Sequence, residues 1–429
     1  MNQSVLIIGA GGREHALAWK LAQSKHIAQI YVAPGNGGTD WQASPGFASC
    51  QSLPIQEMDF DALLDFARSR TIDLTVIGPE APLAAGIVDL FLKSGLQVFG
   101  PSQQAARLES SKAYARDLMR QLNIPSPIYG AFDNADDALA FINEFGQPLV
   151  VKADGLAAGK GVLICDTPRQ AQAAVSDILL DNIFGPAGDQ IVIEERLHGE
   201  EFSVLAFCDG HIAIPMRVAR DYKRALDGDL GLNTGGMGAF APAPDVSETE
   251  IAFVQQSVLQ PIIDTFRQNG TPYIGVLYAG LMRTATGLKV LEFNCRFGDP
   301  ETQVVLPMLK SDLYEVMLAS IEGRLADYPL EWQSGACATV VLASPGYPST
   351  CLKGLPIRID SSCLQSLPFH AGTSKLNGDL VTSGGRVLAL SATAATLNDA
   401  FDKIYADIDH HVSFDNMHYR KDIGGAYRV

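Results

Sequence analysis

The stretch PLVVKADGLAAGKGV, residues 148–162, decides the fold of the middle of this chain. Its apolar run predicts a buried strand, which is followed by Gly155, Gly159 and Gly161. Glycines weaken a strand or hairpin unless the backbone bends sharply or another group must come close. A polyanion is such a group, because bare amides converge on its oxygens while lysines neutralise its charge. A solvent-exposed hairpin turn explains the same stretch, so both interpretations stay open.

This stretch does not contain the common phosphate-binding loop. That loop has the pattern G-x-x-x-x-G-K-[ST], whereas here three residues separate Gly155 from Gly159, and Gly161 follows Lys160. A nucleotide bound here is therefore held by another fold. Lys152 lies at the root of this stretch, which is expected to face solvent, and the lysine is expected to be functional and to contribute little to core packing.

The composition indicates several domains and no nucleic-acid partner. At 429 residues the chain exceeds what one hydrophobic core usually supports, so about three domains are expected. The apolar fraction of 47% is ample for such cores. With 48 acidic and 32 basic residues the net charge is -16, and no run of Lys or Arg offsets it. That charge repels a phosphate backbone.

Cysteine usage and hydropathy favour a cytoplasmic protein without a membrane partner. The seven cysteines are scattered from Cys50 to Cys363 without any C-x-x-C pair, so they are predicted to be small core residues in a reducing compartment. The start, MNQSVLIIGAGG, has no basic residue before a short apolar run, unlike a signal peptide. Apolar stretches also stay shorter than the roughly 18 residues that a membrane span needs.

The first hundred residues alternate between strand and helix patterns. Strands are predicted at SVLIIGA, QIYVAPG, DLTVIGP and LQVFGPS, and helices at REHALAWKLAQS (13–24) and LAAGIVDLFLKSG (83–95). Short buried strands separated by amphipathic helices predict a parallel sheet with helices on both faces. Ligands bind such sheets at the carboxyl ends of the strands, where the loops 9–15 and 78–86 lie.

The first of these loops, GAGGREH, does not match a dinucleotide site. The pattern G-x-G-x-x-G needs a third glycine where this chain has Glu14. We interpret the loop as a helix N-terminus that binds a single phosphate, with Arg13 pairing to it. A strand-to-helix turn without a ligand remains the alternative.

From residue 110 the pattern changes. Ser110 and Ser111 are candidate N-caps of a helix that ends before Pro125, and a strand, the glycine stretch, a helix and the strand QIVIEERL follow. These elements predict a small α+β module, and the segments after Gly335 predict a last αβ unit. The expected fold is thus a multidomain protein of α/β and α+β type.

A second informative stretch is LKVLEFNCRFGDPETQ, residues 288–303. On a strand, Glu292, Asn294 and Arg296 share one face, while Leu291, Phe293 and Cys295 point into a core. A carboxylate and an amide oxygen are hard ligands suited to magnesium. The arginine beside them holds a phosphate or carboxylate. A polar face in solvent, with Arg296 paired to Glu292, is the alternative.

Taken together and in this order, these features resemble the ATP-grasp ligases, in which a flexible glycine loop closes over ATP between two α+β subdomains. Six motifs resemble the phosphoribosylamine–glycine ligase family over essentially the whole chain. They are GGREHALAWKL, GPEAPLAAGIVD, KADGLAAGKGV, DYKRALDGDLGLNTGGMGAFAP, LEFNCRFGDPETQ and MHYRKDIG. Two residues depart from the family pattern: Tyr222 stands where His is frequent, and Cys295 where Ala is usual.

The resemblance implies three domains and a reaction. The expected domains are an N-terminal αβ domain at 1–107, an ATP-grasp domain at 108–327 with a mobile lid at about 122–193, and a small C-terminal αβ domain at 328–429. Glycine would accept the γ-phosphoryl of ATP, and the amine of 5-phosphoribosylamine would displace phosphate from glycyl phosphate to give glycinamide ribonucleotide. The chain is expected to act as a monomer on these small molecules in de novo purine biosynthesis.

The resemblance also implies site residues. For ATP they are Lys112, Lys152, Gly155, Gly159, Lys160, Gly161, Glu194, Glu195, Leu197 and Glu201. For catalysis they are Arg296, Lys152, Asp221 and Lys223. For the substrates they are Gly11, Gly12, Arg13, Glu80, Asn233, Gly235 and Gly236. For Mg²⁺ or Mn²⁺ they are Glu292 and Asn294.

Three functions other than the ligation of glycine are alternatives for this sequence. A different ATP-grasp ligase would share the lid and the metal strand, and would differ in the loop NTGGMG and in the N-terminal phosphate site. An ATP-dependent sensor without turnover would lack a metal ligand or Arg296, which are all present. A nicotinamide-dependent oxidoreductase would need glycine at position 14.

Overall fold

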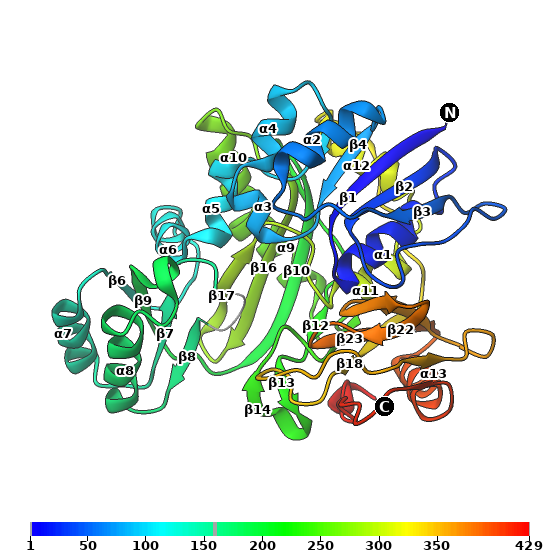
Figure 1. The fold of residues 1–429 in the computed structure, drawn as a ribbon. Helices are drawn as coiled ribbons and strands as arrows, with labels where there is room; N and C mark the ends of the chain where they lie inside the picture. The colour runs from blue at the N-terminus through cyan, green and yellow to red at the C-terminus, as the bar shows by residue number, and fades with distance from the viewer. Residues whose placement is uncertain (1, 158–160, 429) are drawn as a thin grey trace.

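The computed structural model describes residues 2–157 and 161–428 (Figure 1). Its N-terminal part is a parallel sheet with the strand order β3-β2-β1-β4-β5. The strands are β1 (Gln3–Gly9), β2 (Ile27–Pro34), β3 (Ser49–Ser52), β4 (Leu74–Ile77) and β5 (Val98–Phe99). The helices are α1 (Gly12–Leu21), α2 (Phe60–Ser69), α3 (Glu80–Ala84) and α4 (Ile87–Lys93).

The alternation of β1 explains why helices cover both faces of this sheet. Val5 and Ile7 pack in one core with Leu17 of α1, whereas the intervening residues of β1 pack in another core with α2 and α4. The predicted parallel αβ fold is therefore confirmed. The single helix expected at 83–95 is wrong in one respect, because Gly86 takes a left-handed conformation with φ of 86° and separates α3 from α4.

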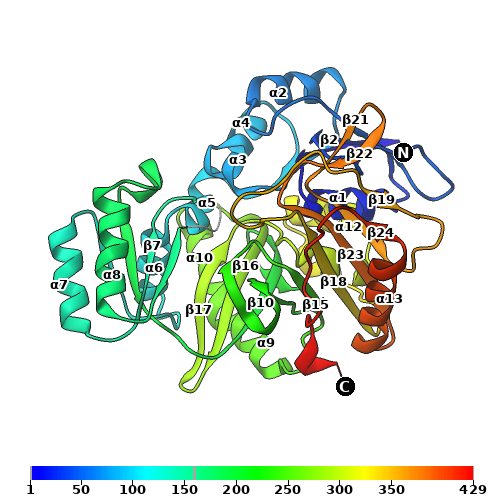
Figure 2. The ribbon, with the colours of Figure 1, turned by 60° about the horizontal axis from the view of Figure 1, so that its bottom comes forward.

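A small antiparallel sheet with the order β6-β9-β7-β8 carries the glycine stretch between two of its strands. Its elements are β6 (Tyr129–Phe132), α7 (Ala135–Phe145), β7 (Leu149–Ala153), β8 (Val162–Cys165), α8 (Pro168–Val175) and β9 (Ile191–Glu195). Buried residues of α7 and α8 pack on the sheet in a core of their own. Figures 1 and 2 both show this unit projecting away from the two chain termini.

Helices α5 (Gln103–Ser110) and α6 (Lys112–Gln121) connect the N-terminal sheet to this unit. Ser111 caps α6 by accepting a hydrogen bond from the amide of Tyr114 at 3.2 Å, as expected for one of the two candidate serines. Ser110 is instead the last residue of α5. Helix α6 ends at Gln121, before Pro125 as predicted, but the chain leaves it through Asn123, which has a left-handed φ of 55°.

The next sheet has the order β11-β10-β16-β17. Its strands are β10 (Glu200–Asp209), β11 (Ala213–Pro215), β16 (Ile274–Thr284) and β17 (Gly287–Asn294). The register of β17 shifts: Glu292 lies opposite Gly280, but Val290 lies opposite the next residue of β16, so Leu291 is an extra residue. Such a bulge changes which side chains share a face. The expectation that Leu291 points into the core is therefore wrong, whereas Phe293 and Cys295 are buried there as predicted.

A fourth sheet, β12-β15-β18-β23-β20, joins strands from distant parts of the sequence. Its strands are β12 (Arg220–Asp221), β15 (Gly238–Ala241), β18 (Ala336–Ala343), β20 (Leu367–His370) and β23 (Arg386–Ala394). Helix α13 (Leu397–His410) packs on β18 and β23. The strands before residue 242 thus complete a sheet whose other members follow residue 335.

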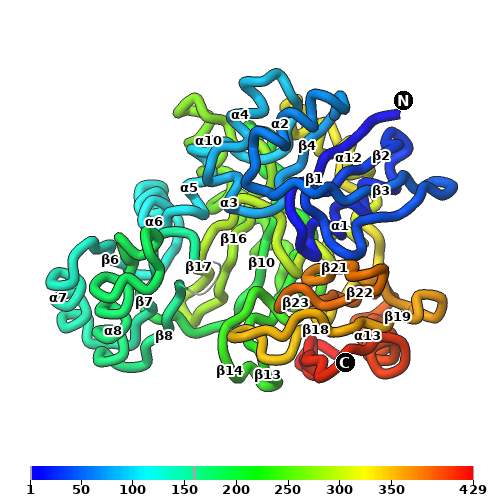
Figure 3. Tube along the Cα trace, in the orientation of Figure 1, coloured from blue at the N-terminus to red at the C-terminus, as the bar shows by residue number. Residues whose placement is uncertain are grey.

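The remaining strands and α-helices of the described residues connect and cover these sheets. They are β13 (Arg224–Leu226), β14 (Leu230–Asn233), α9 (Glu248–Val254), α10 (Gln260–Gln268), α11 (Thr302–Met308), α12 (Leu313–Ile321), β19 (Arg358–Ile359), β21 (Thr373–Leu376), β22 (Asp379–Thr382) and β24 (Val412–Ser413). Figure 3 shows β21 and β22 beside the N-terminal part, and the amide of Gly37 donates to the carbonyl of Thr373 at 3.0 Å. The N-terminal and C-terminal parts therefore share an edge.

Five of the seven cysteines are buried and all seven are free. Cys351 is part-buried and Cys363 is exposed, so the prediction of core cysteines is wrong for these two. Among residues 2–157 and 161–428, no helix combines the length and the apolar character that crossing a bilayer requires.

Candidate active site

Asp154, at the start of the glycine stretch, is tied to the N-terminus of helix α6. Its carboxylate accepts hydrogen bonds from the amide of Ala113 at 2.6 Å and from the hydroxyl of Ser111 at 3.0 Å. Lys112 donates its ammonium to the backbone carbonyls of Asp154 and Gly155, at 3.3 and 3.2 Å. Burial, followed by the charge of Lys152, lowers the pKa of Lys112. Two lysines thus lie together at the root of the stretch.

Lys152 is buried, although it was expected to contribute little to core packing: 8% of the residue is exposed. Its ammonium pairs with Glu194 at 2.7 Å, and Arg116 pairs with the other oxygen of the same carboxylate at 2.7 Å. Burial raises the pKa of Glu194, but Arg116 and Lys152 outweigh it and the net direction is downward. The charge of Lys152 is therefore held in place by a buried, ionised partner.

Arg116 is a residue of the site that sequence analysis missed. Its guanidinium also donates to the carbonyls of Val290 and Leu291, at 2.9 and 2.6 Å, so it links α6 to β9 and to the bulge in β17. The sequence offers one weak signal, because Arg116 lies on the apolar face of a helix, where an arginine needs partners.

Glu292 lies in the middle of a group of cations. Burial raises the pKa of its carboxyl, but Lys223, Lys152, Lys112 and Arg296 together lower it. Within the described part of the chain its carboxylate makes no hydrogen bond or ion pair, and the amide oxygen of Asn294 accepts only a 3.3 Å bond from Arg296. A part-buried carboxylate whose oxygens are unused, beside an amide oxygen, fits a hard divalent cation.

On another side of Glu292, Lys223 pairs with Glu201 at 2.9 Å. Burial raises the pKa of Asp221, Lys223 lowers it, and Glu301, Glu201 and Glu292 add to the rise, so that the pKa is about 7. The expected catalytic pair of Asp221 and Lys223 is thus adjacent to the expected metal ligand. Glu201, which was expected at a ribose, accepts this hydrogen bond from Lys223.

Arg296 connects this group to the N-terminal sheet. Its guanidinium pairs with Glu109 at 2.8 Å and with Glu80 at 3.2 Å. Burial raises the pKa of Glu80, but Arg296 and then Arg13 bring it below its ordinary value. The alternative interpretation of this strand, a polar face in solvent, requires Arg296 to pair with Glu292. Arg296 pairs with Glu80 and Glu109, so the structure contradicts that alternative.

The loop after β1 is already filled by protein. The carboxylate of Glu14 accepts hydrogen bonds from the amide of Gly11 at 2.6 Å and from the Nε of Arg13 at 2.5 Å. A Cβ placed on Gly78 would lie 2.0 Å from the same carboxylate. Glu14 therefore fills the space at the ends of β1 and β4 where a dinucleotide would approach. It also occupies one of the amides expected to bind phosphate.

Beside this loop is a cavity of about 350 Å³ where the N-terminal and C-terminal parts meet. Its lining residues are Ala10, Gly11, Gly35, Asn36, Asp299, Ala371, Gly372, Thr373, Ser383 and Arg386. Arg386 pairs with Asp299 at 3.2 Å, and Gln303 donates to the same carboxylate at 2.7 Å. Sequence analysis missed Asn36, Asp299 and Arg386; only Asp299 lay in a stretch that it had singled out.

The expected substrate loop packs next to this cavity. Arg386 donates to the carbonyl of Gly235 at 2.6 Å, and Gly236 has a φ of 113° that only glycine adopts readily. Asn233 ends β14 nearby in the chain. Gly12 packs closely against Gln303 of α11, because a Cβ on Gly12 would lie 2.6 Å from the side-chain amide nitrogen of Gln303.

The remaining predicted nucleotide residues lie in or near the sheet β6-β9-β7-β8. Glu195 pairs with Lys289 and accepts a bond from the amide of Ile128 at 3.0 Å. Leu197 is part-buried in the connection from β9 to β10. A Cβ on Gly155 would lie 2.7 Å from the Cα of Ala187, and one on Gly161 would lie 2.8 Å from the Cβ of Ala157. Gly159 and Lys160 lie outside the described residues.

Family models match almost the whole chain. The model for the phosphoribosylglycinamide synthetase N domain matches residues 3–109, that for the ATP-grasp (A) domain residues 110–302, and that for the C domain residues 337–426. The predicted three-part architecture with an ATP-grasp core is therefore confirmed.

Individual relatives agree. The phosphoribosylamine–glycine ligase of Halalkalibacterium halodurans is 48% identical over 98% of this chain and 96% of its own length. The enzyme of the same name from Thermotoga maritima has a crystal structure with a TM-score of 0.84 at 32% identity, over 98% of this chain and 99% of that one.

A more distant structure agrees in fold alone. It is the biotin carboxylase domain of a Hydrogenobacter thermophilus 2-oxoglutarate carboxylase in complex with MgADP and bicarbonate, with a TM-score of 0.74 at 13% identity, over 97% of this chain and 92% of that one. The six sequence motifs, the arrangement of the three parts and the match to full-length relatives lead to one conclusion: this chain belongs to the phosphoribosylamine–glycine ligase family, the phosphoribosylglycinamide synthetases.

Proposed function

We propose that this chain uses ATP to join glycine to 5-phosphoribosylamine, giving glycinamide ribonucleotide, ADP and phosphate. One observation carries this proposal beyond family membership. Arg296 pairs with Glu80 of the N-terminal part, and its charge also acts on Glu292, which interacts with Lys112 of α6 and Lys152 of β7. A nucleotide-type site and an N-terminal substrate-type site therefore form one continuous polar region.

Lys112 and Lys152 are suited to the phosphates of ATP because both charges lie at the root of the glycine stretch. The other proposed nucleotide residues are Gly155, Gly159, Lys160, Gly161, Glu194, Glu195, Leu197 and Glu201. Glu292 and Asn294 would hold Mg²⁺ or Mn²⁺, since their oxygens are the hard donors that these ions take. When bound, the ion would neutralise the phosphate charge that develops during transfer.

The proposed reaction has two steps. A carboxylate oxygen of glycine bonds to the γ-phosphorus of ATP as the bond to the β-bridging oxygen breaks, which gives glycyl phosphate and ADP. The amine nitrogen of 5-phosphoribosylamine then bonds to the glycyl carbonyl carbon and loses a proton, and inorganic phosphate leaves. Activation is needed because a free carboxylate does not react with an amine. The work of the protein is positioning and charge neutralisation.

Residue roles follow from position. Arg296 would stabilise the charge of the acyl phosphate. Asp221 and Lys223, with the loop of Asn233, Gly235 and Gly236, would line the sites of glycine and of the reacting amine. Asp221 is the candidate acceptor of the amine proton, because its pKa is raised to about 7.

The cavity beside Gly11 is the proposed site of the phosphoribosyl group. Its phosphate would lie near Gly11, Gly12 and Arg13, and the carboxylate of Glu80 would accept its ribose hydroxyls. Glu14 must release the amide of Gly11 if that amide is to bind the phosphate.

The proposed domains are 1–107, 108–327 with a lid at about 122–193, and 328–429. We propose that the chain works as a monomer in the cytoplasm. Seven free cysteines support a reducing compartment. Sedimentation equilibrium tests the proposed monomer.

An ADP-release assay tests the proposed function. A panel of amino acids, and bicarbonate with biotin, would each be offered with and without 5-phosphoribosylamine. We expect ADP release that needs glycine and 5-phosphoribosylamine together, with glycinamide ribonucleotide formed in equal amount. ADP release that does not depend on glycine, or that depends on bicarbonate, would overturn the proposal and favour another ATP-grasp ligase. Tight binding of NADH would favour the oxidoreductase.

A further inference from the structure

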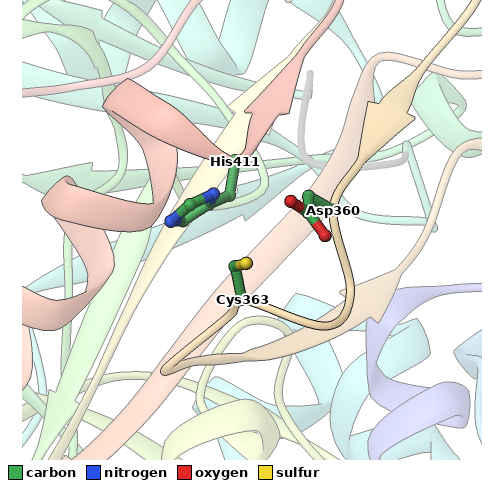
Figure 4. Close-up of side chains that lie close together, drawn as sticks. All are labelled: Asp360, Cys363 and His411. Atoms are coloured by element: carbon green, nitrogen blue, oxygen red, sulfur yellow. The ribbon is translucent and has the colours of Figure 1, made fainter.

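Asp360, Cys363 and His411 converge at the surface of the C-terminal part, away from the candidate active site. One ligand atom from each side chain lies within 4.8 Å of the other two. Figure 4 shows the three side chains around a common space. Asp360 and Cys363 are exposed, His411 is part-buried, and Asp360 and His411 line a hollow of about 880 Å³. The cluster is therefore open to solutes.

The backbone holds two of these residues opposite each other. Strand β19 pairs antiparallel with β24, with Ile359 opposite Val412. The pairing continues by one bond, because the amide of Asp360 donates to the carbonyl of His411 at 2.9 Å. The amide of Cys363 donates to the carbonyl of Asp360 at 3.1 Å and closes a tight turn. The relative positions of the three side chains are thus set by main-chain hydrogen bonds.

The far end of the same loop is fastened to α13 as well. Asp407, which is fully buried, accepts hydrogen bonds from the amides of Gln365 and Ser366 at 3.0 and 2.8 Å, and from the hydroxyl of Ser366. Asp407 lies one helical turn before His411. Both ends of segment 360–366 are therefore anchored near the C-terminal end of one helix, which limits how far the cluster can open.

The donor set differs in kind from that of the candidate active site. A thiol, an imidazole and a carboxylate are the ligands of zinc-type sites, in which three protein groups leave a fourth tetrahedral position for water. Ser362 donates its hydroxyl to one oxygen of Asp360 at 2.7 Å, and this bond orients the carboxylate as outer partners do in metal sites.

A second cluster of possible metal ligands contains no thiol. It consists of His26, Asp312 and Glu315, whose side chains also lie close together. Its groups are already engaged, since Glu315 pairs with His26 at 2.7 Å and Asp312 accepts from the hydroxyl of Ser24 at 2.8 Å. That cluster is explained as an ion-pair network.

We propose that Asp360, Cys363 and His411 form a binding site for a borderline-soft divalent cation of the zinc type, with water as the fourth ligand. Binding replaces the thiol proton of Cys363 by the metal ion and releases that proton to solvent. The bound ion joins segment 360–366 to the end of α13. Because it binds the folded chain, it stabilises that chain by mass action.

Titration of the full-length chain with Co²⁺ tests this site, because a thiolate bound to cobalt gives a ligand-to-metal charge-transfer band that oxygen ligands do not give. We expect a band that saturates at one ion per chain and that Zn²⁺ abolishes by displacement. Cys363→Ser should remove the band. Loss of an outer partner costs metal sites roughly 10- to 100-fold in affinity, and His411→Gln and Asp360→Asn should each cost at least as much.

Two variants serve as controls. Cys351→Ser removes a part-buried thiol elsewhere in the C-terminal part and should keep the band. Glu292→Gln alters the candidate active site and should keep it too, so the outcome does not depend on the proposed ligase function. No band in the wild type, or a band that persists in Cys363→Ser, overturns the proposal. The rate at which Cys363 is alkylated gives a second test. If Zn²⁺ slows this alkylation no more in the wild type than in His411→Gln, the proposal is also overturned.

Discussion

Arg13 and Arg296 donate hydrogen bonds to the same acceptor, the backbone carbonyl of Phe297, at 3.2 and 3.3 Å. Arg13 follows the first strand of the N-terminal sheet, and Arg296 follows the strand that carries Glu292. Two guanidinium groups from distant parts of the chain thus lie side by side at the boundary of two domains. An anionic intermediate formed at this boundary would meet both charges.

Glu292→Gln should keep the shape of the side chain and remove the charge that holds the divalent ion. Turnover should fall by several tenfold steps, each about 1.4 kcal/mol of barrier, and high magnesium should restore part of it. Turnover measured against magnesium concentration checks this. Glu250→Gln, which alters a carboxylate paired with Arg283, should retain the magnesium dependence of the wild type. Coinciding magnesium curves for the wild type and Glu292→Gln would remove Glu292 from the metal site.

Arg116→Lys should raise the KM for ATP and leave the KM for glycine unchanged. Lysine keeps the charge but cannot reproduce the fork that binds Glu194 and two backbone carbonyls, so Lys152 would lose its fixed partner. Arg116→Ala leaves Glu194 with one cation and should destabilise the fold by about 3–5 kcal/mol.

Arg120→Ala is the control for these two variants, because that arginine lies on the same helix with 70% of its side chain exposed. Steady-state kinetics and urea unfolding give the two readouts. A purely structural role for Arg116 predicts lower stability with an unaltered KM for ATP, and that result would contradict the positioning role.

Asp221 should make the stability of the protein fall as the pH rises between about 4 and about 7. Burial raises its pKa from an ordinary value of 3.8 to about 7, so the folded state favours the protonated acid. The stability that protonated Asp221 contributes is fully present below its ordinary pKa of 3.8, and it is lost as the pH rises through its pKa of about 7 in the folded state. Asp221→Asn removes this titration.

The free energy of unfolding of the wild type and Asp221→Asn, measured across that pH range, checks the prediction. The difference between them should change with pH in the stated direction. A constant difference would mean that Asp221 is ionised throughout in the folded protein.

Gly236→Ala should damage the proposed substrate loop without affecting ATP binding. Alanine is strained at a φ of 113°, and its Cβ would lie 2.4 Å from the Cδ of Pro300. We expect a loss of roughly 1–3 kcal/mol of stability and a higher KM for glycine or 5-phosphoribosylamine. Gly425→Ala, where a Cβ would meet nothing within 4 Å, is the control. A raised KM for ATP alone would place the loop elsewhere in the site.

The sequence predicted those parts of the fold that depend on neighbouring residues. The alternation in the first hundred residues predicted the parallel sheet, because each short buried strand and amphipathic helix carries its own period. Ser111 predicted the start of α6, because a cap bonds to an amide three residues away. The three-part architecture was implied by the resemblance of six motifs to a known family.

Features that depend on pairing across the chain were beyond such patterns. Leu291 does not point into the core, because β17 pairs with β16 through a bulge at this residue. The bulge depends on the pairing of the two strands, so the alternation of residues within β17 does not predict it. Lys152 was expected to contribute little to core packing. It is buried, and its ammonium pairs with Glu194, more than forty residues away, whose other carboxylate oxygen pairs with Arg116.

By itself, then, the sequence determined the family, the local elements and the residue types available for chemistry. Only the tertiary structure decided which of them meet: Arg13, Glu80 and Arg296 form one group, and Asp360, Cys363 and His411 another. The physical reason is that local conformation follows from side chains a few positions apart. The contacts of a buried charge follow from how whole sheets and helices pack, which joins residues separated by hundreds of positions.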